Sequence, residues 1–116
     1  MTDDLYRRLQ QHLDRMPVGF PATASGVELR ILERLFSPED AEVALELSAL
    51  PEPLHVIHRR LRSRLSREAL AARLEDMARR GLIERHRGRS AVRSEWRLLA
   101  STHNLLKLHR HRISTA

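Results

Sequence analysis

Leucine recurs every fourth residue near the start of the chain, at Leu5, Leu9 and Leu13. This spacing places the three side chains on one face of a helix, which we predict over residues 3–15. Pro17 ends this helix because proline cannot continue the backbone hydrogen bonding. The apolar face either covers the core of its own domain or pairs with a second chain in a homodimer, and the pattern leaves both open.

A loop rich in proline and glycine follows over residues 16–25, and Phe20 is the apolar side chain expected to anchor it. Ser25 stands before the next apolar stripe and Glu28 follows three residues later, a spacing typical of a capping box. We therefore predict that Ser25 caps a second helix, which ends at Phe36.

The third helix has a strong start at Ser37-Pro38-Glu39-Asp40, with a capping serine, a proline in the first turn and two acids. We expect this helix to include Leu45 and Leu47 and to stop before Pro51. Glu39 and Asp40 are interpreted as capping groups rather than as a catalytic pair.

Two further helices are predicted over residues 53–62 and 66–80, separated by a short break. Ser66 caps the second of them, and Gly81 ends it in a left-handed conformation. After Gly81 the apolar period changes, so we predict two strands of a hairpin over residues 82–99.

The order helix, short turn, helix, hairpin is typical of a winged helix-turn-helix. The fold class predicted is therefore mostly helical with a small β-hairpin, a winged helix-turn-helix with additional N-terminal helices. The expected organisation is one domain over residues 1–99, with extra helices in 3–50, the helix-turn-helix in 53–80, the wing in 82–99, and a tail in 100–116 that includes a short helix.

Composition narrows the class of protein. The 116 residues include no cysteine, which excludes disulfides, thiolate metal sites, iron–sulfur ligation by cysteine and a cysteine nucleophile. No apolar run reaches the roughly 20 residues of a membrane helix, and the acidic N-terminus does not resemble a signal peptide. We expect a soluble cytoplasmic protein with no membrane partner.

The net charge of +6 is unevenly distributed. Residues 1–52 contain five arginines and ten acids, residues 53–97 contain thirteen arginines and five acids, and residues 98–116 carry a charge of +3 with no acid. Twenty of the twenty-one basic residues are arginine, which suits bidentate contacts with phosphate. A basic segment of this kind favours a polyanionic partner.

The first hypothesis for function is therefore a DNA-binding protein similar to transcription regulators, with duplex DNA as its partner. The candidate DNA-binding residues are the arginines of the two helices, the turn and the wing: Arg59, Arg60, Arg62, Arg64, Arg67, Arg73, Arg79, Arg80, Arg85, Arg87, Arg89 and Arg93. The outward face of the 66–80 helix is predicted to carry Glu68, Ala72, Glu75 and Arg79. Its two carboxylates repel phosphates, so phosphate contacts from the turn and wing are favoured over base reading.

Two strings in the sequence carry a family resemblance. MPVGFPATASGVELRILERLFSPEDAEVAL at residues 16–45 and LEDMARRGLIER at residues 74–85 resemble the N-terminal winged-helix region of bacterial and archaeal ferredoxin-type proteins that bind four-iron four-sulfur clusters. The resemblance covers about residues 5–99 and implies the fold and a role in docking or regulating a redox protein. It implies no cluster ligand in this chain, which has no cysteine.

The alternative hypothesis is thus a non-catalytic protein-interaction module. A continuous basic stripe from turn to wing favours DNA, whereas arginines paired with acids favour docking. The acids in question are Glu68, Glu75, Glu84 and Glu95.

No catalytic, cofactor or metal site is predicted. His55 and His58 lie one helical turn apart, and His109 and His111 lie in the tail, but nothing supplies a third ligand for zinc. His58 is interpreted as a solvated surface group. No serine elbow or glycine-rich phosphate loop is present, so we expect no enzyme. Trp96 is expected in the core rather than stacked on a base.

Overall fold

The computed structural model describes residues 2–17, 19–87, 94–99 and 102–115. The chain divides into two units, which we call the helical unit (Met1–Leu45 with Ala100–Ala116) and the sheet unit (Glu46–Leu99). The described residues are mostly helical, with one small antiparallel sheet of three strands. None of the helices described has the length and apolar character needed to span a bilayer.

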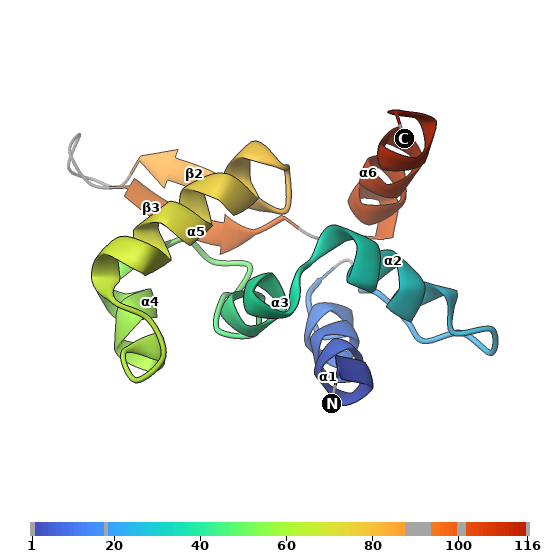
Figure 1. The fold of residues 1–116 in the computed structure, drawn as a ribbon, viewed down its shortest axis with the longest axis horizontal. Coiled ribbons are helices and arrows are strands. Elements are labelled where there is room, and N and C mark those ends of the chain that lie inside the picture. Colours follow the sequence, from blue (N-terminus) through green and yellow to red (C-terminus); the bar gives the residue numbers. More distant parts are fainter. Residues whose placement is uncertain (1, 18, 88–93, 100–101, 116) are drawn as a thin grey trace. The chain divides into compact units, whose positions relative to one another are not determined.

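The helical unit contains α1 (Thr2–Asp14), α2 (Val27–Leu35), α3 (Pro38–Ala44) and α6 (Thr102–Thr115). Helix α1 packs against α2 and α3, and α2 packs against α6 (Figure 1). Leu9 and Leu13 on α1 are fully buried, and Leu5 is nearly so. The predicted leucine face is confirmed, and it forms the core of its own unit rather than a surface open to a second chain.

Polar groups fix the loop between α1 and α2. The backbone nitrogen of Phe20 donates to Asp14 Oδ1 at 3.0 Å, and Gln10 Nε2 donates to the carbonyl of Phe20 at 2.8 Å. Phe20 itself is buried, as predicted for the loop anchor. Gly19 has φ of 79°, a conformation in which a side chain is strained, so the approach to this anchor favours glycine.

The predicted cap of α2 is wrong. The N-cap is Gly26, with φ of 73°, and Ser25 makes no capping bond to this helix. Glu28 does not complete a capping box but accepts hydrogen bonds from Thr23, at 3.1 Å from its backbone nitrogen and 2.6 Å from its hydroxyl. The path of the loop brings Thr23, rather than Ser25, to the carboxylate.

Helix α3 starts as predicted and ends earlier. Ser37 and Asp40 form a reciprocal capping box, each side chain accepting from the other's backbone nitrogen at 3.1 Å. The helix ends at Ala44, so the expectation that it continues through Leu47 is wrong. The chain beyond it instead contacts the sheet, where the carbonyl of Ser48 accepts from the backbone nitrogen of Leu98 at 2.8 Å.

The sheet unit contains β1 (Glu52–Pro53), α4 (Leu54–Leu61), α5 (Arg67–Arg79), β2 (Ile83–Arg87) and β3 (Ser94–Leu98). The strand order is β1-β3-β2, and both pairs are antiparallel. Helix α5 lies alongside β2 (Figure 1). The two predicted strands are present as β2 and β3, whereas β1, which pairs with β3, was not predicted.

Local signals place α5 correctly. Ser66 Oγ accepts from the backbone nitrogen of Ala69 at 3.1 Å, which caps the first turn. At the other end Gly81 has φ of 86°, and Leu82 donates its backbone N–H to the carbonyl of Met77 at 3.0 Å in a Schellman arrangement. The buried side of this unit is apolar and includes Ile57, Leu61, Leu70, Leu74, Met77, Ile83, Trp96 and Leu98.

Candidate nucleic-acid interface

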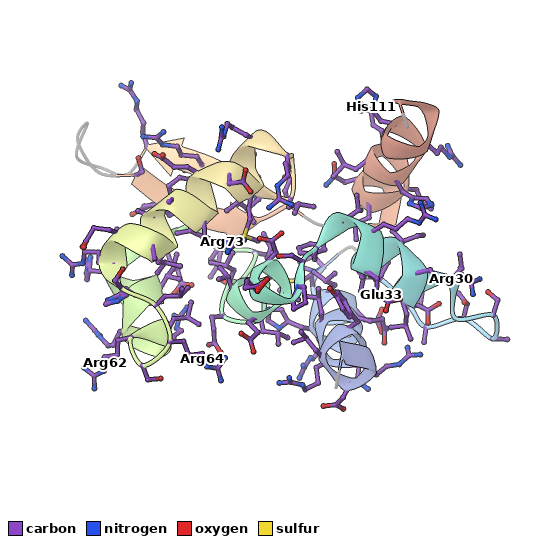
Figure 2. All side chains as sticks on the ribbon, viewed as in Figure 1. Arg30, Glu33, Arg62, Arg64, Arg73 and His111 are labelled. Atoms are coloured by element: carbon purple, nitrogen blue, oxygen red, sulfur yellow. The ribbon has the colours of Figure 1, made fainter. Side chains whose placement is uncertain are left out.

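Exposed arginines gather where α4 ends and α5 begins. Arg59 lies in the last turn of α4, Arg62 is its C-cap residue and Arg67 is the first residue of α5. All three are exposed, and within the described residues none of their side chains has a hydrogen bond or an ion pair. Figure 2 shows Arg62 and Arg64 at this turn with their side chains directed away from the ribbon. Arg64 is also exposed but has a partner.

Arg60 is used differently from its neighbours. Its Nη1 donates to Glu52 Oε1 at 2.8 Å and to the carbonyl of Glu46 at 2.7 Å. The hydrogen bond from Arg60 lowers the pKa of the Glu52 carboxyl, and burial only partly opposes this. Arg60 therefore fastens α4 to β1. Sequence reasoning missed Glu52, because the pairing depends on β1, which no local pattern predicts.

His58 is also structural. It is half-buried, and its Nε2 lies 2.9 Å from the carbonyl oxygen of Leu65. A carbonyl only accepts, so Nε2 donates the proton. The interpretation of His58 as a solvated group is therefore wrong, since the side chain ties α4 to the turn that follows it.

The exposed face of α5 carries the four predicted side chains, Glu68, Ala72, Glu75 and Arg79. Asp76 beside this face pairs with Arg79 at 3.4 Å and with Arg80 at 2.7 Å. Arg73 is half-buried and has a partner of its own. The middle of α5 therefore presents few cations that are available to a ligand.

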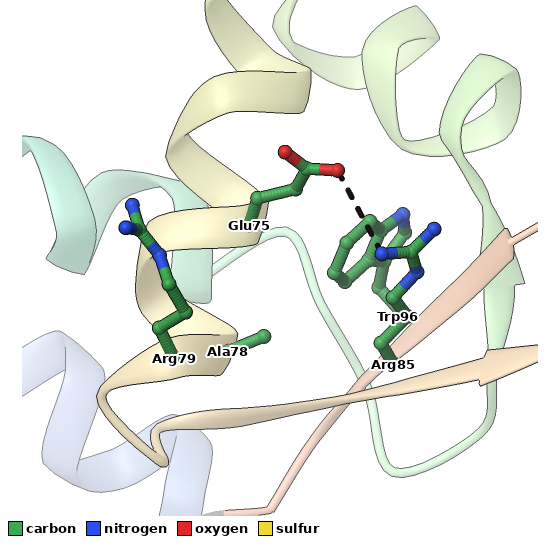
Figure 3. Close-up of a pocket in the computed structure, with 5 residues that line it drawn as sticks. All are labelled: Glu75, Ala78, Arg79, Arg85 and Trp96. Atoms are coloured by element: carbon green, nitrogen blue, oxygen red, sulfur yellow. Dashed lines mark ion pairs between the residues drawn. The ribbon is translucent and has the colours of Figure 1, made fainter.

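Arg85 of β2 lies over the indole of Trp96, with its guanidinium carbon 5.5 Å from the ring centroid. Its Nε donates to Ser94 Oγ at 2.9 Å, and its Nη1 lies 3.8 Å from Glu75 Oε1. Figure 3 shows this guanidinium between the carboxylate on α5 and the ring on β3. Trp96 is only 4% exposed, which confirms the prediction that it belongs to the core.

Strand β2 contributes one more exposed arginine. Arg87, at the end of β2, is exposed, and its side chain has neither a hydrogen bond nor an ion pair within the described part of the chain. Two other predicted DNA contacts, Arg89 and Arg93, lie outside the described residues.

The opposite face of the sheet is occupied by an ion-pair cluster. Arg97 Nε donates to Glu84 Oε1 at 3.0 Å, and His86 Nε2 contacts the same carboxylate. The hydrogen bond from Arg97 lowers the pKa of Glu84, and the bond from His86 adds to this. Glu75 and Glu84 thus engage arginines, whereas Glu68 and Glu95 form no ion pair among the described residues.

Two hollows lie between α5 and the sheet. One, of about 560 Å³, is lined by Glu75, Ala78, Arg79, Arg85 and Trp96. The other, of about 360 Å³, shares Glu75, Arg85 and Trp96 and extends past His55 and Arg67. We call the pair the α5 groove. Glu75 and Arg85, which contact each other, line both halves.

The net charge belongs entirely to the sheet unit, whose sequence has thirteen arginines and seven acids, whereas the helical unit has eight basic and eight acidic residues. Among the described residues no group of three or more histidines and carboxylates gathers in a way that could hold a metal ion. Comparison of the chain with protein-family models, curated proteins and solved structures gives no match.

Proposed function

We propose that the sheet unit is a winged helix-turn-helix that binds duplex DNA, mainly through phosphates. The order β1, α4, α5, β2, β3 and the strand order β1-β3-β2 support this proposal, since the second helix of such a unit crosses the first and a hairpin flanks it. In this arrangement α5 is the helix that approaches the major groove and β2 with β3 forms the wing.

The observation that carries the proposal is the set of exposed arginines without partners. Arg59, Arg62 and Arg67 surround the turn, and Arg87 ends the wing strand. A guanidinium without an internal partner loses no ion pair when it contacts a phosphate, and each contact releases counterions from the DNA. These four side chains are the main phosphate ligands in the proposal.

In this proposal, contacts between α5 and the edges of the bases contribute little to the affinity for DNA. Glu68 on the exposed face of α5 has no ion pair in the described structure and repels phosphates, and Glu75 is engaged with Arg85. The alanines on the same helix carry no hydrogen-bonding group for a base edge. Affinity for duplexes of different sequence is therefore expected to be similar, which separates this protein from a sequence-specific regulator.

The test is a titration of a labelled duplex of mixed sequence, followed by fluorescence anisotropy across a series of salt concentrations. The triple variant combines Arg59→Gln, Arg62→Gln and Arg67→Gln and removes up to three phosphate contacts. The negative slope of log affinity against log salt concentration then becomes less steep by about 2.7. Arg30→Gln is the matched control, because Arg30 is an exposed arginine of the helical unit. Absence of binding at low salt, or an equal loss of slope in the control, overturns the proposal.

The alternative function, a docking module for another protein, draws on the arginines that are already paired. Arg85 pairs with Glu75 and Arg97 with Glu84, two of the four acids whose pairing favours docking. If this alternative holds, the triple variant leaves DNA affinity unchanged. Charge reversal at Glu68, an exposed acid of α5 with no ion pair in the described structure, then abolishes binding of the protein partner.

A further inference from the structure

The α5 groove has the size and the side chains of a small-molecule site, independently of DNA. Its larger half has a volume of about 560 Å³, within the range of roughly 300–1,000 Å³ that is usual for ligand pockets. An aromatic residue, a small apolar residue and charged groups line it together. We propose that the groove binds a small planar aromatic carboxylate, held by Arg85 above Trp96.

Arg85 is already oriented for this ligand. Its cation–π contact with Trp96 and its hydrogen bond to Ser94 hold the guanidinium in place. The Nε is used in that bond, while Nη1 and Nη2 make no hydrogen bond within the described residues. These two groups form the fork that a carboxylate accepts in a bidentate pair.

The contact that now occupies Arg85 is weak enough to be exchanged. Its distance from Glu75 is 3.8 Å, too long for a hydrogen bond. Both side chains are more than half exposed, and exposed ion pairs contribute little to stability. A ligand carboxylate can therefore take the place of Glu75 without a large cost.

The lining also selects the charge and shape of the ligand. Arg79 and Arg85 line the larger half and Arg67 and Arg85 the smaller, with Glu75 the carboxylate common to both. This excess of positive charge favours an anion. Ala78 leaves space for a flat ring beside the Arg85 fork, and Arg79, which lines the same half, offers a second guanidinium, on which an aromatic ring stacks more favourably than an aliphatic ring does.

Trp96 supplies the readout, because it is the single tryptophan of the sequence and lies in the groove. The full-length protein is titrated with benzoate while tryptophan emission is recorded, in the absence of DNA. A saturable change with a dissociation constant on the order of millimolar is expected for a probe of this size. Cyclohexanecarboxylate has the same charge without the aromatic ring, and benzylammonium has the ring with the opposite charge, so both bind more weakly.

Two variants locate the site. Arg85→Gln weakens benzoate binding at least tenfold, whereas Arg30→Gln, at an exposed arginine of the helical unit, leaves it unchanged. Glu75→Gln removes the competing carboxylate and tightens benzoate binding by up to about fivefold. This variant keeps Arg85 and the groove, so it tests the site even if Arg85→Gln destabilises the fold. Equal responses to the three probes, no saturable response, or an unchanged affinity in both groove variants overturns the proposal. No DNA is present, so this outcome is independent of the proposed function.

Discussion

The two units use charged side chains in opposite ways. In the helical unit basic and acidic residues are equal in number, and the buried polar side chains of the described chain, Gln10, Glu28 and Asp40, all belong to it. The sheet unit has nearly two arginines for each acid, yet its buried side chains are apolar. Polar groups therefore organise the helical unit internally, while the sheet unit folds around an apolar core and keeps its charge on the surface.

Replacement of Glu28 is the strongest test of whether the helical unit depends on buried polar groups. It is 3% exposed and accepts two hydrogen bonds from Thr23 and one from Arg7. Glu28→Ala leaves these donors without their acceptor, so we expect a loss of about 2–3 kcal/mol in the free energy of unfolding. Hydrogen exchange measured separately for α1–α2 and α4–α5 checks whether the loss is confined to the helical unit. Glu33→Ala, at an exposed position of the same helix, is the control and changes stability by less than about 0.5 kcal/mol.

The same residue predicts a response to acid. Burial raises the pKa of Glu28, but hydrogen bonds from Thr23, the backbone and Arg7 outweigh it, so the pKa lies below its ordinary value of 4.5. A carboxyl with a lowered pKa stabilises the fold above pH 4.5 and loses this contribution as the pH falls through its folded value. The protection factors of amides in α1–α2, which compare observed with intrinsic exchange rates at each pH, should therefore fall below about pH 4.5 in the native chain. In Glu28→Gln the fall should be smaller, and an unchanged profile would contradict the assignment.

In the sheet unit the corresponding test is the replacement of Ser66, which caps α5. Ser66 Oγ receives one hydrogen bond at the exposed start of α5. Ser66→Ala is expected to cost about 1 kcal/mol, and Ser66→Gly less, because glycine tolerates the cap position. Urea denaturation followed by circular dichroism measures both. A loss as large as that of Glu28→Ala would mean that this unit also depends on a polar group for its fold.

The smallest effect is expected at the pair of Glu52 and Arg60. The Arg60 side chain is 37% exposed, and solvent screens such pairs. Glu52→Gln is therefore expected to cost about 0.5 kcal/mol in the same urea experiment. A larger loss would show that β1 depends on this contact rather than on its pairing with β3.

Sequence reasoning succeeded where the signal is local. Ser37, Ser66 and Gly81 mark helix ends through bonds to residues a few positions away, and the faces of α1 and α5 follow from helical spacing. It failed at Ser25, because the choice between Ser25 and Thr23 as partner of Glu28 depends on the path of the whole loop. Likewise β1 has two residues and exists only through its pairing with β3.

The sequence predicted which arginines belong to the candidate site, but not which of them are engaged by other side chains. All the arginines named for it belong to the sheet unit, but the sequence does not distinguish Arg60, which is held by Glu52, from Arg59, which is exposed and has no described partner. The pairing of Arg85 with Glu75 joins a strand to a helix ten residues earlier in the chain. Such pairings follow from tertiary packing, so spacing along the sequence does not reveal them.

The strand order leaves one side of β2 without a neighbouring strand among the described residues. An open strand edge is a template on which other chains add and from which aggregates grow. Here four consecutive ionisable side chains, Glu84, Arg85, His86 and Arg87, run along that edge. Charged side chains on an edge strand disfavour the addition of a further strand, so the open side of β2 is a poor template for self-association.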